Sequence, residues 1–188
     1  MTTMNMFKAL SITAAVLLAS SNGLRAAEPT KLTALDYIEI EQLSAKYSFA
    51  IDTCTNKGYD YADLYTDDGE FAVSDTWGKQ GKVYAKGRDA LANADGGGPD
   101  GCRDPKTMLG YGITHVLVDL VITPTATGAT GRCKLIAFGV GNIPTQIEQQ
   151  GGYEDTYVKT AKGWRFKTRT HVFPNMQNSL QFGKKKEG

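Results

Sequence analysis

One of the chain's two histidines, His115, lies where a proton-transfer group would be held on a rigid element. It is the second residue of the run THVLVDLVI at 114–122, whose composition predicts a buried or half-buried β-strand. A desolvated imidazole needs a hydrogen-bond partner, and its unperturbed pKa is the closest to neutrality of all side chains. His115 is therefore a candidate general base, although a core histidine satisfied by a backbone carbonyl would give the same pattern.

Asp52 is the partner that we expect for His115. It follows a predicted amphipathic helix at 32–51 and precedes the turn formers Asn56 and Gly58. Six apolar residues of this helix share a sector about 100° wide: Leu32, Ile40, Leu43, Tyr47, Ala50 and Ile51. Asp52 lies about 140° from Tyr47 on an ideal helical wheel, so the two share a pocket only if the helix ends or loosens at Asp52.

A carboxylate paired with an imidazole has a simple chemical rationale. The carboxylate accepts the ring N–H, fixes the tautomer, and stabilises the imidazolium that forms when the other nitrogen removes a proton. Tyr47, on the buried face of the helix, could donate a hydrogen bond to a substrate oxygen or leaving hydroxyl. A tyrosine that only packs in the core, with a partner for its hydroxyl, is an equal alternative.

The last predicted strand, at 164–173, carries a second group of candidates. Alternation places Arg169, His171 and Phe173 on one face and Trp164 and Phe166 on the other. If Arg169 lines a pocket, His171 and Phe173 line it too. Alternation alone equally allows the opposite assignment, in which the charged face meets water.

Aromatic residues elsewhere would suit an aromatic substrate. Tyr153 shares a strand face with Asp155, and Tyr65, Trp77 and Tyr111 are further candidates for the pocket wall. Each of these three aromatics is individually more typical of a core residue than of a substrate contact.

The first 27 residues resemble a signal peptide. Lys8 precedes an apolar run at 9–20 that is too short to span a bilayer. We expect export, to the periplasm in a bacterium, with loss of roughly the first 21–27 residues, which an intact mass from the native host would show. The mature domain then covers 28–183, followed by a basic tail at 184–188, and the mature form has no membrane span.

Charge and cysteine usage restrict the partners. A net charge of +1 without a clustered basic face argues against nucleic acid. Cys54 and Cys102 lie in predicted loops and are the preferred disulfide pair, whereas Cys133 lies in a strand pattern and should pack as a small hydrophobe. No Cys-x-x-Cys or His/Cys cluster occurs in the sequence, so we expect no metal site.

The order of elements predicts an α+β domain. We expect three helices, at 32–51, 59–65 and 86–94, with one strand at 70–74 between the second and the third. Four strands follow, at 114–123, 131–140, 152–159 and 164–173. Helices first and strands later favour an antiparallel-rich sheet. The glycine-rich segment 95–105 is long enough to form a lid or a pocket rim.

This order resembles the SnoaL-like branch of the NTF2-like superfamily over about residues 32–173. The resemblance rests on the helix with Tyr47 and Asp52, the YTDDGEF turn into a strand, the KGRDA helix start, the His115 strand, and the later GYED and GWR motifs. It implies a cone in which a curved sheet wraps around about three helices and encloses a pocket. Asp52 and His115 match the Asp/His dyad of dehydratase and dehydrochlorinase-like members, and Arg169 resembles a pocket arginine of some members.

The resemblance and the residues together predict a lyase or dehydratase that needs no cofactor and acts on a small, mostly apolar, aromatic molecule. In this hypothesis His115 removes a proton, Asp52 orients it, Tyr47 and Arg169 stabilise the oxygen or leaving group, and His171, Tyr153 and Phe173 contact the substrate. Cleavage of a carbon–carbon bond with release of a small aldehyde is equally allowed. The alternatives are an isomerase or cyclase with the same dyad, and a non-catalytic ligand-binding or dimerisation module. We also expect a homo-oligomer, a dimer or a trimer.

Overall fold

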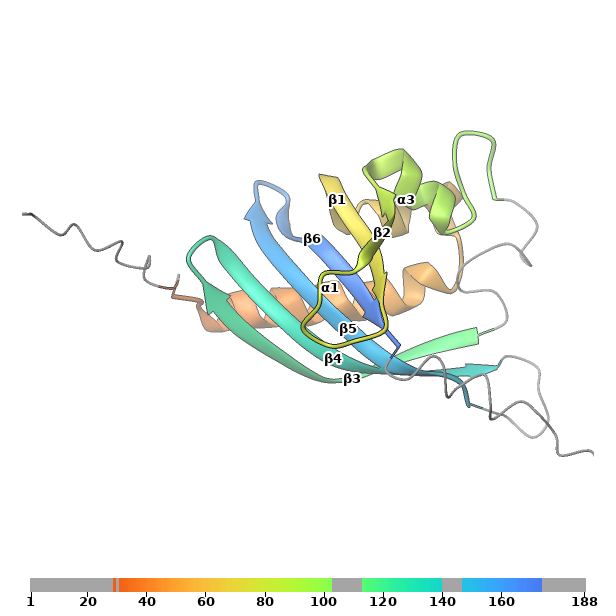
Figure 1. Cartoon of the computed structure of the whole chain (residues 1–188). Coiled ribbons are helices and arrows are strands. Elements are labelled where there is room, and N and C mark those ends of the chain that lie inside the picture. The colour runs from red at the N-terminus through yellow and green to blue at the C-terminus, as the bar shows by residue number, and fades with distance from the viewer. Residues whose placement is uncertain (1–28, 30, 103–112, 140–146, 174–188) are drawn as a thin grey trace, which may run out of the picture.

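The computed structural model describes residues 29, 31–102, 113–139 and 147–173. Three helices and a short 3-10 turn accompany one six-stranded sheet (Figure 1). The helical elements are α1 (Ala34–Ile51), the 3-10 turn η1 (Thr55–Gly58), α2 (Tyr59–Ala62) and α3 (Arg88–Ala94), and the strands are β1 (Tyr65–Ser74), β2 (Lys82–Lys86), β3 (Ile113–Thr125), β4 (Gly128–Gly139), β5 (Ile147–Thr160) and β6 (Gly163–Val172). The predicted leader at 1–27 and the tail at 184–188 lie outside the described residues.

The sheet is curved and mostly antiparallel. Its strand order is β2-β1-β6-β5-β4-β3, and β1 and β6 are the parallel pair. Helix α1 runs across one face of the sheet, and α3 lies beside β1 and β2 at one end of it (Figure 1). Helix α2 packs against α3. The predicted α+β cone with an antiparallel-rich sheet is thus confirmed. None of the helices in the described parts of the chain is long and apolar enough to cross a membrane.

Helix α1 begins at a capping box and buries the predicted face. The Thr33 side chain accepts from the Asp36 backbone N–H, and the Asp36 carboxylate accepts from the Thr33 backbone N–H. Asp36 also accepts from Trp164 Nε1 at 2.9 Å, which fixes the start of the helix to β6. All six apolar residues expected on the inner face are buried, so the amphipathic pattern placed the helix correctly.

Helix α1 ends at Ile51, so the condition for Tyr47 and Asp52 to share a pocket is met. Asp52 is the C-cap residue, and the chain then turns through Cys54, Asn56 and Lys57, all of which have positive φ. Gly58 follows with φ +80° and fits against α3, where a Cβ would lie 2.6 Å from the Ala92 carbonyl oxygen. Only glycine fits this close approach.

A disulfide joins Cys54 to Cys102, the pair that the sequence analysis preferred. It closes a segment of 48 residues that includes α2, α3, β1 and β2. A cross-link over a loop of this length restricts the unfolded chain and stabilises the folded one. Cys133 is free and buried, and burial raises the pKa of its thiol to about 11.

Strand β6 contains an irregularity that changes the predicted faces. Thr156 pairs with Thr168, but the next residue of β5, Tyr157, pairs with Phe166, so Lys167 is an extra residue in β6. This bulge reverses the alternation. Phe166 is therefore buried on the same side as Arg169, and the expectation that they lie on opposite faces is wrong.

Two other elements differ from the sequence prediction. Strand β2 was not expected, because it is a short edge strand of which only Ala85 is buried. Strand β1 begins at Tyr65 rather than at Glu70, since the segment predicted as a turn is already extended. The predicted second helix accordingly ends at Ala62 instead of Tyr65.

Candidate active site

A cavity of about 120 Å³ lies between the inner face of α1 and the curved sheet. Its wall includes residues of α1, β1, β2, β3 and β5 and the end of β6. The described residues that line it are Tyr47, Ile51, Phe71, Val73, Tyr84, His115, Gln149, Tyr153, His171 and Phe173. An apolar cavity of about 150 Å³ holds one benzene molecule, so this one has room for about a single aromatic ring.

Asp52 and His115 meet at one end of this cavity. The carboxylate Oδ1 lies 2.6 Å from the ring Nδ1, so Asp52 is the hydrogen-bond partner of His115 that the sequence analysis expected. Asp52 Oδ2 also accepts from the backbone N–H of His115 at 3.0 Å. The carboxylate therefore holds both the ring and the main chain of His115, and its hydrogen bond to Nδ1 leaves the ring Nε2 for a substrate. The His115 side chain is 5% exposed and that of Asp52 is 16% exposed.

Tyr47 and Tyr153 form a second polar pair in the same cavity. The Tyr47 hydroxyl donates to the Tyr153 hydroxyl at 3.2 Å, and the Tyr47 ring meets the His115 ring edge-to-face with centroids 6.5 Å apart. Burial raises the pKa of both tyrosines above the usual value, so both remain neutral hydrogen-bond donors at ordinary pH. Because Tyr47 donates to Tyr153, the proton of Tyr153 remains available to the cavity.

Arg169 lies behind the cavity rather than in its wall. It is fully buried and donates from Nε and Nη2 to the two oxygens of Asp155, both at 2.9 Å. Its guanidinium carbon is 3.9 Å from the ring centroid of Tyr47 and 4.3 Å from that of Tyr153. Arg169 thus supports the two tyrosines by cation–π contacts. In this structure it does not reach the cavity as a substrate ligand.

His171 and Phe173 line the cavity, as the sequence analysis expected of them. Their ring centroids are 3.5 Å apart, and the ring centroid of His171 lies 4.8 Å from that of Tyr153.

The other aromatics suggested for the pocket do not line it. Tyr65 is in the core and hydrogen-bonds Tyr61, and Trp77 packs against Arg132 on the side of β5 that carries Gly152 and Glu154. Tyr111 lies outside the described residues.

The sequence analysis missed several residues of the cavity wall. Phe71 and Val73 come from β1, Tyr84 from β2 and Gln149 from β5. The alternation of β1 could have indicated Phe71 and Val73, since both share its inner face. Tyr84 could not have been found without β2. Among the described residues, no group of three or more His, Cys, Asp or Glu side chains is arranged to hold a metal ion.

Asp95 is a further titratable group near the dyad that the sequence did not reveal. It follows α3, is 0% exposed, and neither of its carboxylate oxygens has a hydrogen-bond partner within the described parts of the chain. Burial, reinforced by the negative charge of Asp52, raises the pKa of Asp95 to about 8. At neutral pH the folded protein therefore holds Asp95 largely as the neutral acid.

Asp95→Asn should stabilise the protein at alkaline pH. In the unfolded chain this carboxyl ionises near pH ~4, so between pH ~4 and ~8 the folded state binds more protons, and the free energy of unfolding falls as pH rises. Asparagine has no proton to lose, so the free energy of unfolding of the variant should exceed that of the parent by about 5 kcal/mol at pH ~8 and equal it at pH ~4. Urea unfolding at both pH values measures this. The exposed Asp60→Asn serves as control, and an equal response from both variants would contradict the assignment.

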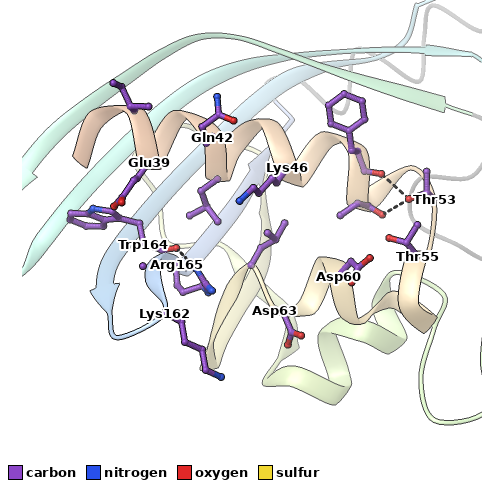
Figure 2. Close-up of a pocket in the computed structure, with 16 residues that line it drawn as sticks. Glu39, Gln42, Lys46, Thr53, Thr55, Asp60, Asp63, Lys162, Trp164 and Arg165 are labelled. Carbon is purple, nitrogen blue, oxygen red and sulfur yellow. Dashed lines mark hydrogen bonds between the residues drawn. The ribbon is translucent and has the colours of Figure 1, made fainter. Parts of the chain in front are cut away.

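A larger groove of about 860 Å³ lies elsewhere, between α1, α2 and the turn before β6. Figure 2 shows charged side chains along it, with Glu39 and Lys46 on α1 opposite Lys162 and Arg165. None of the described residues that line it is a histidine, and the Asp52–His115 pair is not part of it. The candidate residues for proton transfer are therefore at the smaller cavity.

Solved structures with the same fold support the description of the cone. An NTF2-like protein with a cystatin-like fold from Novosphingobium aromaticivorans is 25% identical, with 79% of this chain and 88% of that chain covered and a TM-score of 0.59. A candidate scytalone dehydratase from the same organism is 26% identical, with 73% and 83% covered and a TM-score of 0.51. A candidate aromatic ring hydroxylase, also from that organism, is 21% identical, with 76% and 92% covered and a TM-score of 0.56.

No curated protein sequence matches the chain. The model of the SnoaL-like domain does match, over residues 33–170, which includes α1, the dyad and most of β6. The matched segment spans nearly all of the described helices and strands, and the fold is that of NTF2-like proteins. The chain therefore belongs to the SnoaL-like family.

Proposed function

We propose that the protein is a cofactor-independent lyase, of the dehydratase or carbon–carbon lyase type, that acts on a small aromatic alcohol. The observation that carries the proposal is the contact of Asp52 with both the ring and the main chain of His115, a residue that lines a cavity of about one-ring size. This contact engages Nδ1 and leaves Nε2 for a substrate. A cavity that only holds a ligand does not need this arrangement. The likeness to a candidate scytalone dehydratase supports it.

The proposed reaction uses the two polar pairs in sequence. Asp52 keeps the proton of His115 on Nδ1, so Nε2 accepts a proton from the substrate. In a dehydration, the electrons of the broken C–H bond form the new double bond, and the hydroxyl leaves as water after it accepts a proton from Tyr153. In a carbon–carbon cleavage, Nε2 removes the alcohol proton, a small aldehyde departs, and the carbon left behind is protonated. Tyr47 and Arg169 hold Tyr153 in place in both cases.

A panel of aromatic alcohols with one ring tests the proposal. Incubation followed by mass spectrometry should show loss of either one water or one small aldehyde from a member of the panel, and no conversion with His115→Ala. Isomerisation at unchanged mass would instead support an isomerase or cyclase. Saturable binding of panel members without any product would contradict the lyase and support a ligand-binding module.

We also propose that the protein is exported and forms a homo-oligomer. The signal-like first 27 residues support export, and the disulfide is typical of oxidising compartments. Val116, Val118 and Val121 are exposed on edge strand β3, together with Ile147 on β5, and such apolar positions suit contact with a second copy. Sedimentation velocity of the mature protein tests the oligomer, and a monomer at micromolar concentration would contradict it.

A further inference from the structure

His171 is a buried polar side chain of the cavity that the proposed reaction does not use. It stands at the end of β6, is 5% exposed, and its ring packs against those of Tyr153 and Phe173. Its Nε2 is buried without a hydrogen-bond partner in any described part of the chain. A buried polar atom without a partner destabilises the folded protein, so a ligand that supplied the missing hydrogen bond would bind more tightly than one that did not.

The His171 ring must be neutral in the folded protein. Its pKa is lowered to about 3, first by burial and then by the positive charges that His115 and Arg169 can carry. A neutral imidazole has one donor nitrogen and one acceptor nitrogen. At His171 itself a ligand carboxylate or ammonium group would meet an uncharged ring, whereas a hydroxyl both donates and accepts, so it satisfies His171 in either tautomer.

The two histidines stand on different parts of the cavity wall. His115 is on β3 and His171 is on β6, and β4 and β5 lie between these strands in the sheet. Aromatic rings line the cavity together with the two histidines, among them those of Tyr47, Phe71, Tyr153 and Phe173. A molecule that presents its reacting carbon to His115 therefore has its aromatic ring among these side chains and can offer a second group to His171.

We propose that His171 determines substrate specificity by hydrogen bonding a hydroxyl group on the aromatic ring, so that the substrates are single-ring phenols whose side chain reacts at His115. This inference rests on the proposed function for the identity of the reacting end, but the phenol site itself does not depend on turnover. His171 acts here as a binding residue and takes no part in the proton transfer.

Nitrogen NMR tests the site directly, because the chain has only two histidines. Protein labelled with ¹⁵N-histidine should show two imidazoles, which His115→Gln assigns. We expect His171 to stay neutral down to pH ~4.5, given its lowered pKa. Addition of phenol should shift the Nε2 resonance of His171, whereas toluene, which has the same shape without the hydroxyl, should leave it nearly unchanged. A phenol response confined to His115 would overturn the proposal.

Binding measurements supply the second test. In His171→Leu, the dissociation constant of phenol should rise by about tenfold or more relative to that of toluene. This change corresponds to the loss of one hydrogen bond in a buried site. His171→Gln keeps a donor and an acceptor and should retain most of the preference. The matched control is Val73→Ala, which alters the cavity wall without removing a polar atom. An unchanged ratio in His171→Leu would overturn the proposal.

These outcomes separate the two proposals. If phenol binds at His171 but no phenolic alcohol is converted, the lyase fails and the binding site stands. If alcohols are converted equally well with and without a ring hydroxyl, and the KM for the phenolic ones is unchanged in His171→Leu, the lyase stands and the phenol site fails.

Discussion

His115→Ala should lower turnover by about 10²–10⁴-fold while the fold persists, because a positioned general base typically contributes this much to the rate. The His115 side chain lines the cavity and hydrogen-bonds Asp52, whereas β3 pairs with β4 through the backbone, so removal of the ring leaves that pairing intact. Single-turnover kinetics on the substrate found in the panel measures the chemical step. Circular dichroism and the melting temperature confirm the fold.

Asp52→Asn should also act mainly on turnover. An asparagine oxygen can still accept from the backbone N–H of His115, but its amide then donates to Nδ1 and forces the ring proton onto Nε2, the nitrogen that must accept. The variant therefore keeps the shape and inverts the tautomer. Neither variant should respond to a chelator. Near-parental turnover in His115→Ala would contradict the dyad mechanism. Sensitivity to a chelator would contradict a mechanism without a metal cofactor.

Asp155→Ala should destabilise the protein by about 3–5 kcal/mol, since removing one partner leaves a buried charge without compensation. Asp155 and Arg169 are both fully buried, and two hydrogen bonds of 2.9 Å join them. Asp155 also accepts from the Tyr157 hydroxyl at 2.7 Å. Without the carboxylate, the guanidinium would remain among three aromatic rings with no counter-charge. Urea unfolding gives the free-energy difference.

The neighbouring Glu154 provides a matched control for this prediction. It forms a salt bridge with Arg132 on the other side of the sheet, where the arginine side chain is 58% exposed. An exposed ion pair contributes about 0–1 kcal/mol, so Glu154→Ala should have only a small effect on unfolding. Equal losses in the two variants would show that the burial of Asp155 and Arg169 does not determine the energetics of this region.

The elements that position the dyad could be predicted because their signals are local. The inner face of α1 follows from a helical period that the structure reproduces, and the end of the helix at Asp52 follows from Asn56 and Gly58 just after it. The β-strand containing His115 follows from its apolar, β-branched composition. The pairing of Asp52 with His115 is a contact over 63 residues, and it came from the family resemblance rather than from any local pattern.

The parts that were missed depend on tertiary contacts. The position of Arg169 behind the cavity depends on the bulge at Lys167 and on Asp155, and neither has a signature in simple alternation. The burial of Asp95 depends on how α3 packs on the turn after α1, where the Gly98 N–H donates to the Lys57 carbonyl at 2.9 Å. Strand β2 is mostly exposed, so it lacks the apolar pattern that identifies a buried strand.

The cavity wall extends along the chain from Tyr47 to Phe173, with contributions from the first helix and from both edge strands of the sheet. A fragment shorter than residues 47–173 does not contain all of these residues, so the complete site forms only after Tyr47 and Phe173 have come together. Occupancy and folding are therefore thermodynamically linked: a ligand at a hundred times its dissociation constant adds about 2.7 kcal/mol to the stability of the whole domain. Thermal-shift screening of compound libraries can thus identify ligands of this protein before any reaction is known.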